Sequence, residues 1–163
     1  MKRILLGLLV LLSVSLSAQV KRDNFIDKFA GNLKITYQRI SNLDNGDTKY
    51  YVFLSFQNIN NRLIDIKTVA LFSIADMEVC VKDMKSVFRQ MSTSEKVNMD
   101  WTRDKYKITL YDFTNKMHFT EPRTGGSTTI SKRNVSDLLE IMSTIDFGKE
   151  TLLPSKTIYE LVP

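Results

Sequence analysis

The sequence predicts an α+β fold in which an antiparallel sheet of about six to seven strands is covered on one face by two amphipathic helices. Three observations lead to this prediction. Several short segments alternate apolar and polar residues, the apolar period lengthens to that of a helix in two places, and short turns rich in Gly, Asn and Asp separate the segments.

The first 18 residues have the three-part layout of a secretory signal peptide. Lys2 and Arg3 precede an apolar run over residues 4–12, and small residues lead up to Ala18. The apolar run is shorter than the roughly 20 residues of a membrane-spanning helix. We therefore expect cleavage after Ala18 and export to the periplasm or the extracellular space, without a stable membrane anchor. A retained N-terminal anchor is the alternative.

The leader ends in SVSLSAQ and opens into a small chain of hairpins and amphipathic helices. In these two respects the sequence resembles uncharacterised small exported proteins of the Bacteroidota. The resemblance implies export across an inner membrane, and it implies no particular activity.

Removing residues 1–18 from the 163 residues of the chain leaves 145, which suits a single globular α+β domain over residues 19–163. The formal net charge of the whole chain is +5, and it falls to +3 when Lys2 and Arg3 are removed. Because the basic residues are spread out, we expect no nucleic-acid partner. The single cysteine, Cys80, cannot form an internal disulfide, and we expect it to be buried.

Residues 24–32 carry Phe25, Ile26 and Phe29 at about one-turn spacing and end beside Gly31, which predicts a short N-terminal helix. Residues 33–40 and 50–58 then alternate as two strands.

Asn45-Gly46 between these strands predicts a type I′ hairpin turn. That turn would pair Ile35 with Phe56 and Tyr37 with Leu54. The packed face of the hairpin would then consist of Leu33, Ile35, Tyr37, Val52, Leu54 and Phe56.

Residues 65–74 predict a further strand, and a helix is expected over about residues 75–90. Its apolar stripe consists of Met77, Val81, Met84, Phe88 and Met91, with Cys80 beside it. Three strands in a meander follow, over residues 97–102, 106–113 and 117–122.

A brief strand at residues 128–130 leads into the second helix, for which Ser131 and Asn134 are alternative N-caps. The apolar residues of this helix are Val135, Leu138, Leu139, Met142 and Ile145. The tail over residues 149–163 has no clear period, and Pro154 interrupts it. The two halves of the chain have a similar order of elements without a residue-level repeat.

We assign no catalytic residue, no metal site and no cofactor. A zinc site needs several cysteine or histidine ligands, and the chain has only Cys80 and His118. The same two residues would have to form any Cys–His nucleophilic pair, but their patterns place them on unrelated faces. Asp44, Asn45 and Asp47 fit the chemistry of a tight turn better than a calcium loop.

Aromatic residues are the strongest candidates for a binding surface. The ligand-binding residues expected from the sequence are Tyr51, Trp101, Tyr106 and Tyr111. Aromatic rings beside Lys105 and Lys107 would suit a protein or envelope-glycan partner. The alternative is that these rings cover the second face of the sheet against the C-terminal tail.

The leading hypothesis is an exported, non-catalytic domain that binds a protein or an envelope ligand through a sheet face or edge. The alternative is a carboxylate-based hydrolase of an envelope glycan or peptide, for which Asp100, Asp104, Asp112 and Glu121 are the acids of the meander. A third hypothesis is binding to anionic surfaces, which needs the basic residues within 103–107 and 132–133 to share one face.

Overall fold

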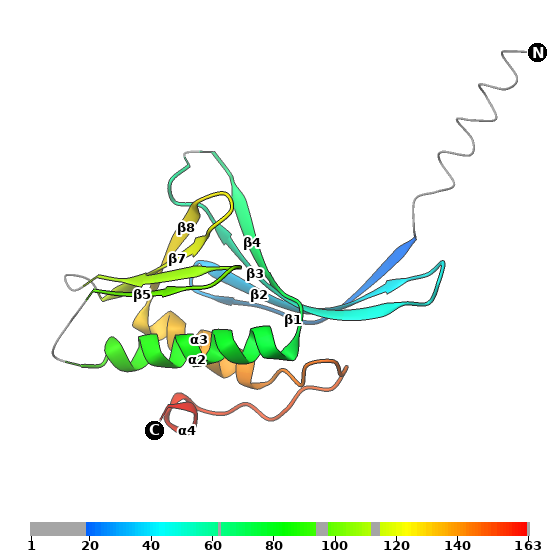
Figure 1. Ribbon diagram of the computed structural model, residues 1–163. Coiled ribbons are helices and arrows are strands. Elements are labelled where there is room, and N and C mark those ends of the chain that lie inside the picture. The colour runs from blue at the N-terminus through cyan, green and yellow to red at the C-terminus, as the bar shows by residue number, and fades with distance from the viewer. Residues whose placement is uncertain (1–18, 62, 94–97, 112–114, 163) are drawn as a thin grey trace, which may run out of the picture.

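The computed structural model of the chain describes residues 19–61, 63–93, 98–111 and 115–162. In this part of the chain, eight strands form two antiparallel sheets of four strands each, and three helices accompany them (Figure 1). The α+β class is confirmed. The expectation of one sheet with six to seven strands is wrong, because the chain leaves the first sheet through a helix and then starts a second meander.

The first sheet has the order β1 (Val20–Ala30), β2 (Leu33–Asn42), β3 (Thr48–Gln57), β4 (Ile66–Leu71), and α2 (Ile74–Gln90) follows it. The second sheet has the order β5 (Met99–Thr102), β6 (Lys107–Leu110), β7 (Lys116–Glu121), β8 (Gly126–Ser131), and α3 (Lys132–Ser143) follows it. A tail with the short helix α4 (Ile158–Leu161) ends the described chain. Each half is therefore a four-stranded meander followed by a helix. Parts of the predicted strands, residue 97 and residues 112–113, lie outside the described residues.

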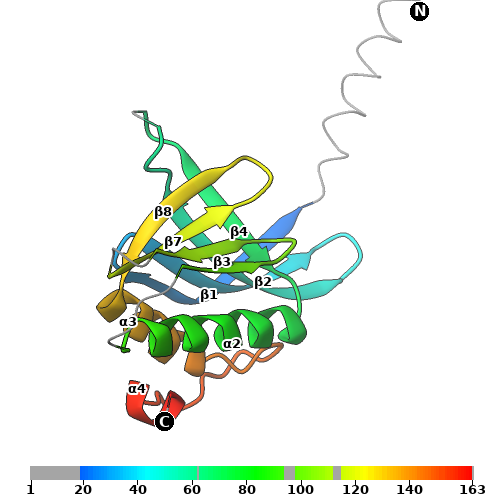
Figure 2. The ribbon, with the colours of Figure 1, turned by 60° about the vertical axis from the view of Figure 1, so that its left-hand side comes forward.

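Both sheets share one core with the helices. Figures 1 and 2 show α2 and α3 on the same side of the two sheets, with the tail running along the far side of the helices. Phe56 on β3 meets Phe119 on β7 edge to face, with ring centroids 5.7 Å apart. The two sheets are thus joined by buried side chains, and residues of both belong to one hydrophobic cluster.

The N-terminal segment is a strand, and the prediction of a helix over residues 24–32 is wrong. β1 pairs with β2 along its length, through a turn at Gly31 with φ of 62°. The register shifts between Asn24 and Ile26, as in a β-bulge, and Phe25 and Ile26 both pack against the core. This bulge breaks the strict alternation of a strand, and the resulting spacing resembles that of a helix.

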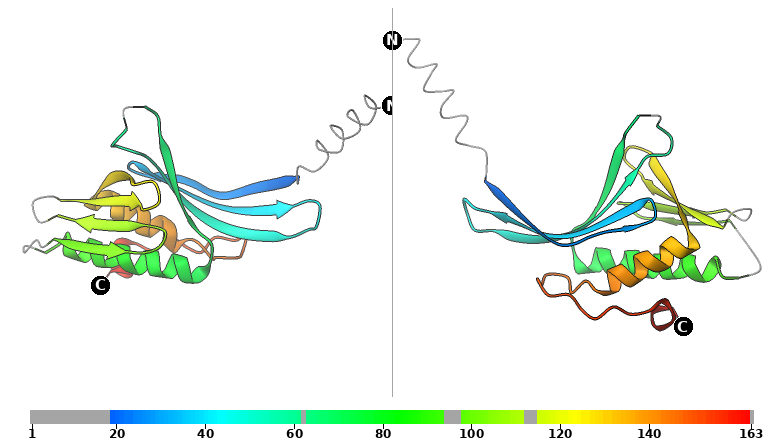
Figure 3. Two further views of the ribbon diagram at one scale, coloured as in Figure 1. Left: turned by 45° about the horizontal axis from the view of Figure 1, so that its top comes forward. Right: turned by 180° about the vertical axis from the view of Figure 1, so that it is seen from behind.

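The predicted packed face of the β2–β3 hairpin is confirmed, because all six of its residues are buried. The predicted register is wrong by two residues: Ile35 pairs with Leu54 and Tyr37 with Val52. A loop over residues 43–47 replaces the two-residue turn, and Gly46 is its only residue with positive φ. A shift of two residues keeps every side chain on its face, so the face was correct although the pairs were not. Figure 3 shows this hairpin reaching beyond the helices.

Both long helices begin at a serine N-cap. The Ser73 hydroxyl accepts from the Asp76 N–H at 3.1 Å, and the Ser131 hydroxyl accepts from the Asn134 N–H at 3.3 Å, so Ser131 is the N-cap of α3. Cys80 of α2 has no exposed surface, as predicted. Burial, reinforced by the nearby charge of Asp83, raises the pKa of its thiol to about 12.

A buried carboxylate joins α2 to the second sheet. Asp83 is 2% exposed and accepts hydrogen bonds from Arg103, on the β5–β6 turn, and from the Tyr106 hydroxyl at 2.8 Å. Burial by itself would raise the pKa of Asp83, but these hydrogen bonds and the Arg103 charge outweigh it and hold that pKa below its ordinary value. Tyr106 stacks on Phe119, so the cluster lies against the core.

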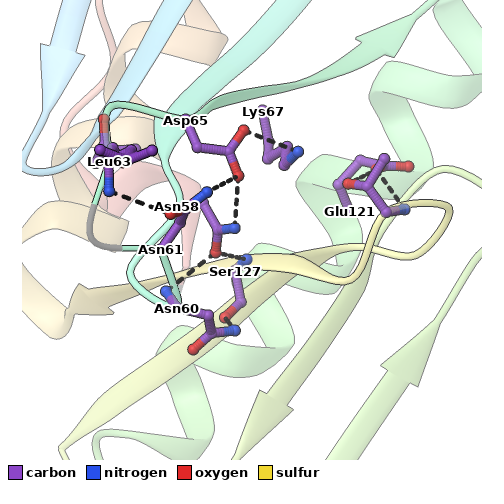
Figure 4. A network of polar contacts seen from close by, with 10 residues as sticks. Asn58, Asn60, Asn61, Leu63, Asp65, Lys67, Glu121 and Ser127 are labelled. Carbon is purple, nitrogen blue, oxygen red and sulfur yellow. Dashed lines mark hydrogen bonds and ion pairs between the residues drawn. The ribbon is translucent and has the colours of Figure 1, made fainter.

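A second polar network fixes the β3–β4 loop to β8 (Figure 4). The Asn58 side chain donates to Asp65 at 2.8 Å and accepts from the backbone N–H groups of Asn60 and Ser127, both at 3.1 Å. Asn60 in turn donates to the Ser127 hydroxyl. The loop therefore has a fixed base, although its apolar side chains Leu63 and Ile64 are 76% and 89% exposed.

Candidate ligand-binding groove

The four aromatic residues expected to bind a ligand do not lie on one surface. Tyr106 is buried and belongs to the Asp83 cluster, and Trp101 on β5 is partly buried against the core. Tyr51 lies on β3 with its ring 5.7 Å from that of Phe53 and 5.6 Å from that of Phe72. Tyr111 follows β6, and its ring meets that of His118 edge to face at 5.0 Å. Tyr51 therefore belongs to a partly exposed aromatic group at the first sheet, whereas Tyr111 is exposed beside the second sheet.

Three basic residues of the third hypothesis, Arg103, Lys105 and Lys107, are paired with acids and so offer less free charge to an anionic surface. Arg103 pairs with Asp83, and Lys105 pairs with Asp76. Lys107 pairs with Asp100 at 2.9 Å. On α3, Lys132 lies over the Phe88 ring, with 5.2 Å between its Nζ and the ring centroid.

Two of the four acids of the meander, Asp100 and Glu121, are used in structural contacts, and Asp104 is exposed on the β5–β6 turn. Asp100 pairs with Lys107, and that hydrogen bond lowers its pKa. Burial would raise the pKa of Glu121, but this carboxylate accepts hydrogen bonds from the Thr124 hydroxyl and from the backbone N–H groups of Arg123 and Thr124 in the β7–β8 turn, and these bonds lower its pKa. Asp112 lies outside the described residues. A general acid at neutral pH needs a raised pKa, so these contacts give the hydrolase alternative no support.

A concave feature that combines charge with apolar surface lies on the helical side of the described chain. It is a groove of about 610 Å³, lined by α2 on one side and by α3 and the tail on the other. The size falls within the ordinary range of ligand sites. We call it the basic groove. Its apolar lining consists of Met77, Val81, Leu139, Met142, Ile145 and Leu161, and its basic side chains are Lys82, Lys85, Arg89 and Lys156.

The pattern of α2 explains one side of the basic groove. The buried stripe of α2 faces the sheets, whereas Lys82, Lys85 and Arg89 occur at positions i, i+3 and i+7 and therefore lie along one neighbouring face. Val81 lies beside this row and is only partly buried. A row of cations thus borders an apolar strip on the same helix.

The tail forms part of the other side because hydrogen bonds fix it to α3. The Leu153 N–H donates to the Thr144 carbonyl at 2.8 Å, the Lys156 N–H to the Ser143 hydroxyl at 3.2 Å, and the Ile158 N–H to the Glu140 carboxylate at 3.1 Å. At the start of the tail, the Tyr37 hydroxyl donates to the Lys149 carbonyl at 2.7 Å and accepts from the Gly148 N–H at 2.9 Å. These contacts place Lys156 and Leu161 at the groove.

The described lining residues of the basic groove carry more cations than carboxylates. Among the described residues, no carboxylate lies within ion-pair distance of Lys82, Lys85, Arg89 or Lys156. Glu78 is the one acid among the described lining residues, so four cations and one carboxylate give the lining a formal charge of +3. The nearby carboxylates of Glu140 and Glu160 accept hydrogen bonds from the tail backbone. Anionic groups would therefore be attracted to this groove.

Sequence reasoning missed the basic groove. The spacing of Lys82, Lys85 and Arg89 on a predicted helix was a usable signal, because it marks one helical face. The α3 side and Lys156 had no such signal, since their position depends on how the tail packs.

Elsewhere in the described residues, no helix is long and apolar enough to cross a membrane, and no three metal-ligating side chains come together.

Comparison of the chain with known protein families, with curated proteins and with solved structures found no significant match.

Proposed function

We propose that the protein is an exported, non-catalytic binding domain, and that the basic groove binds a ligand with both anionic and apolar parts. The leader over residues 1–18 is the basis for export to the periplasm or beyond. The observation that carries the binding function is the set of four cations without carboxylate partners beside an apolar lining. The proposed site lies on the helical side, whereas the sequence pointed to a sheet face.

The chemistry of the lining supports binding rather than catalysis. Lys and Arg side chains attract and orient anionic groups, and the partly exposed Val81 and Leu161 side chains offer apolar surface that a ligand can bury. Met77 and Met142 belong to the hydrophobic core and form part of the floor beneath these side chains. A ligand that is only anionic or only apolar would contact only one of these two kinds of side chain, basic or apolar.

Binding of the anionic apolar dye 8-anilinonaphthalene-1-sulfonate tests this proposal. We expect the purified, folded chain to bind the dye, and the Lys82→Glu/Lys85→Glu variant to bind it about tenfold more weakly. The Arg22→Glu/Lys28→Glu variant has the same change in net charge at two exposed residues of β1 that do not line the groove, so it is the control. Equal dye affinity of the two variants would refute the proposal.

A further inference from the structure

The basic side chains of the groove are spread along its length. Lys82 and Arg89 are seven residues apart on α2, which at 1.5 Å per residue separates them by about 10 Å along the helix axis. Lys85 lies between them, and Lys156 lies on the tail. A lipid or fatty acid concentrates its charge in one headgroup, which would meet only one end of this row. The spacing fits an elongated ligand that carries several anionic groups.

The apolar lining of the groove lies between two helices that pack against each other. These helices are α2 and α3, and the groove between them has a floor of the buried core residues Met77, Leu139 and Met142 with partly exposed apolar side chains, Val81 and Leu161, beside it. Figure 2 shows α2 and α3 lying close together, with the tail on their outer side. An amphipathic helix can lay its apolar residues into such a trough and keep its polar residues toward the rim. The row at Lys82, Lys85 and Arg89 would then face acidic residues one turn apart on the bound helix.

We infer that the occupant of the basic groove is an acidic amphipathic helix of a partner protein, with apolar residues at helical spacing and Glu or Asp along one flank. This inference rests on the proposed function of the groove and adds the chemical class of its ligand. The charge complementarity sets the orientation, because the flank that carries the acids must lie toward α2. Basic or uncharged amphipathic helices are rejected, since they leave the cations of the groove without partners.

The test uses three fluorescently detected probes with the purified full chain. The first is a synthetic peptide of about four helical turns, with leucines at i, i+3, i+4 and i+7 and glutamates along one flank. The second peptide has lysines in place of the glutamates. The third probe is monomeric lysophosphatidylglycerol, an anionic lipid with one acyl chain. Each probe is titrated against the wild-type chain, the Lys82→Glu/Lys85→Glu variant and the Arg22→Glu/Lys28→Glu control.

We expect the acidic peptide to bind with a gain of helical circular dichroism, and its affinity to fall about tenfold in the Lys82→Glu/Lys85→Glu variant and to stay unchanged in the control. The lysine peptide should not bind. If only the lipid binds, and the same variant weakens it, the inference is overturned while the proposed function stands. If neither the acidic peptide nor the lipid binds, or if the variant has no effect on either, both the inference and the proposed function fail.

Discussion

Arg103, on the turn between β5 and β6, holds the buried carboxylate of Asp83 on α2 with two hydrogen bonds: its Nε donates to Oδ2 at 2.8 Å and its Nη2 to Oδ1 at 2.7 Å. Tyr106 adds a third hydrogen bond to the same carboxylate. This is a side-chain link between the second sheet and the helix that carries the cations of the basic groove. The link therefore helps to hold α2, and with it one side of the groove, against the second sheet.

Replacing Asp83 by Ala should therefore destabilise the fold. The variant loses three hydrogen bonds to a charged group and leaves the buried Tyr106 hydroxyl without its acceptor, so we expect the free energy of unfolding to fall by about 2 to 3 kcal/mol. Urea denaturation measures this change. Glu78→Ala is the control on the same helix, because Glu78 is exposed, and its effect should stay within about 0.5 kcal/mol. Similar effects of the two substitutions would contradict the structural role of Asp83.

The same residue predicts a dependence of stability on pH. Burial would raise the pKa of Asp83, but the hydrogen bonds from Arg103 and Tyr106 outweigh it, so the pKa in the folded chain lies below the ordinary value of 3.8. The unfolded chain binds a proton at Asp83 more readily than the folded chain does. The ionised Asp83 therefore stabilises the fold at pH values above 3.8, and this stabilisation is lost as the pH falls from 3.8 toward the lower pKa of the folded chain. We expect Asp83→Asn to be less stable than the wild type at pH 7, and the difference to shrink at pH values below about 4. A difference that does not change with pH would exclude this explanation.

Replacing Gly31 by alanine should lower the free energy of unfolding more than replacing Gly125, a glycine of similar backbone conformation. Gly31 and Gly125 have φ of 62° and 69°, but a Cβ on Gly31 would lie 1.8 Å from Nδ2 of Asn134 on α3, whereas a Cβ on Gly125 would meet nothing within 4 Å. Gly125→Ala should cost about 1 to 2 kcal/mol through backbone strain alone. Gly31→Ala should cost more in thermal or urea unfolding.

Asn134→Ala provides the matched background for this comparison, because it removes the atoms that the new Cβ would strike. In that background the cost of Gly31→Ala should approach the cost of Gly125→Ala. Equal costs of the two glycine substitutions in the otherwise wild-type chain would show that β1 and α3 do not approach so closely.

The network around Asn58 predicts a local effect on the β3–β4 loop. Asn58→Ala removes the acceptor of the Asn60 and Ser127 N–H groups, so we expect the free energy of unfolding to fall by about 1 to 3 kcal/mol and amide exchange at Ser127 to accelerate. Asn61→Ala is the control in the same loop, since its side-chain bonds are exposed. Unchanged exchange at Ser127 would mean that Asn58 does not hold the loop.

The leader predicts the start of the exported chain. If residues 1–18 are a signal peptide, the protein purified from the envelope or culture medium of its host should begin at Gln19. N-terminal sequencing or intact mass measurement decides this point. A chain that keeps Met1 and stays with the inner membrane would indicate a retained anchor.

Most elements of the fold could be predicted from local patterns, and the failures occurred where a local pattern was ambiguous. The stripes of α2 and α3 extend over several turns, so their period was clear. In β1 the bulge near Phe25 mimicked helical spacing over a segment too short to distinguish the two periods. The arrangement of the strands in two packed sheets could not be predicted from local patterns. It depends on contacts such as that between Phe56 and Phe119, which are distant in the sequence.

The candidate site was less predictable than the fold. Tyrosine and tryptophan side chains are enriched at binding surfaces, but Tyr106 is a partner of Asp83 inside the core. Sequence alone could not distinguish a buried aromatic residue from an exposed one. Conversely, Lys82, Lys85 and Arg89 resembled an ordinary solvated helix face until the tail placed Leu161 and Lys156 beside them.

The most direct test of the basic groove as the binding site is a nuclear magnetic resonance titration of the ¹⁵N-labelled chain with the acidic peptide described above. We predict that the largest shifts of backbone amides occur at Lys82, Lys85, Ser143 and Lys156, which line the groove. Shifts concentrated instead around Tyr51 and Phe72 on the first sheet, or at the exposed Leu63 and Ile64, would contradict the assignment of the binding site to the groove.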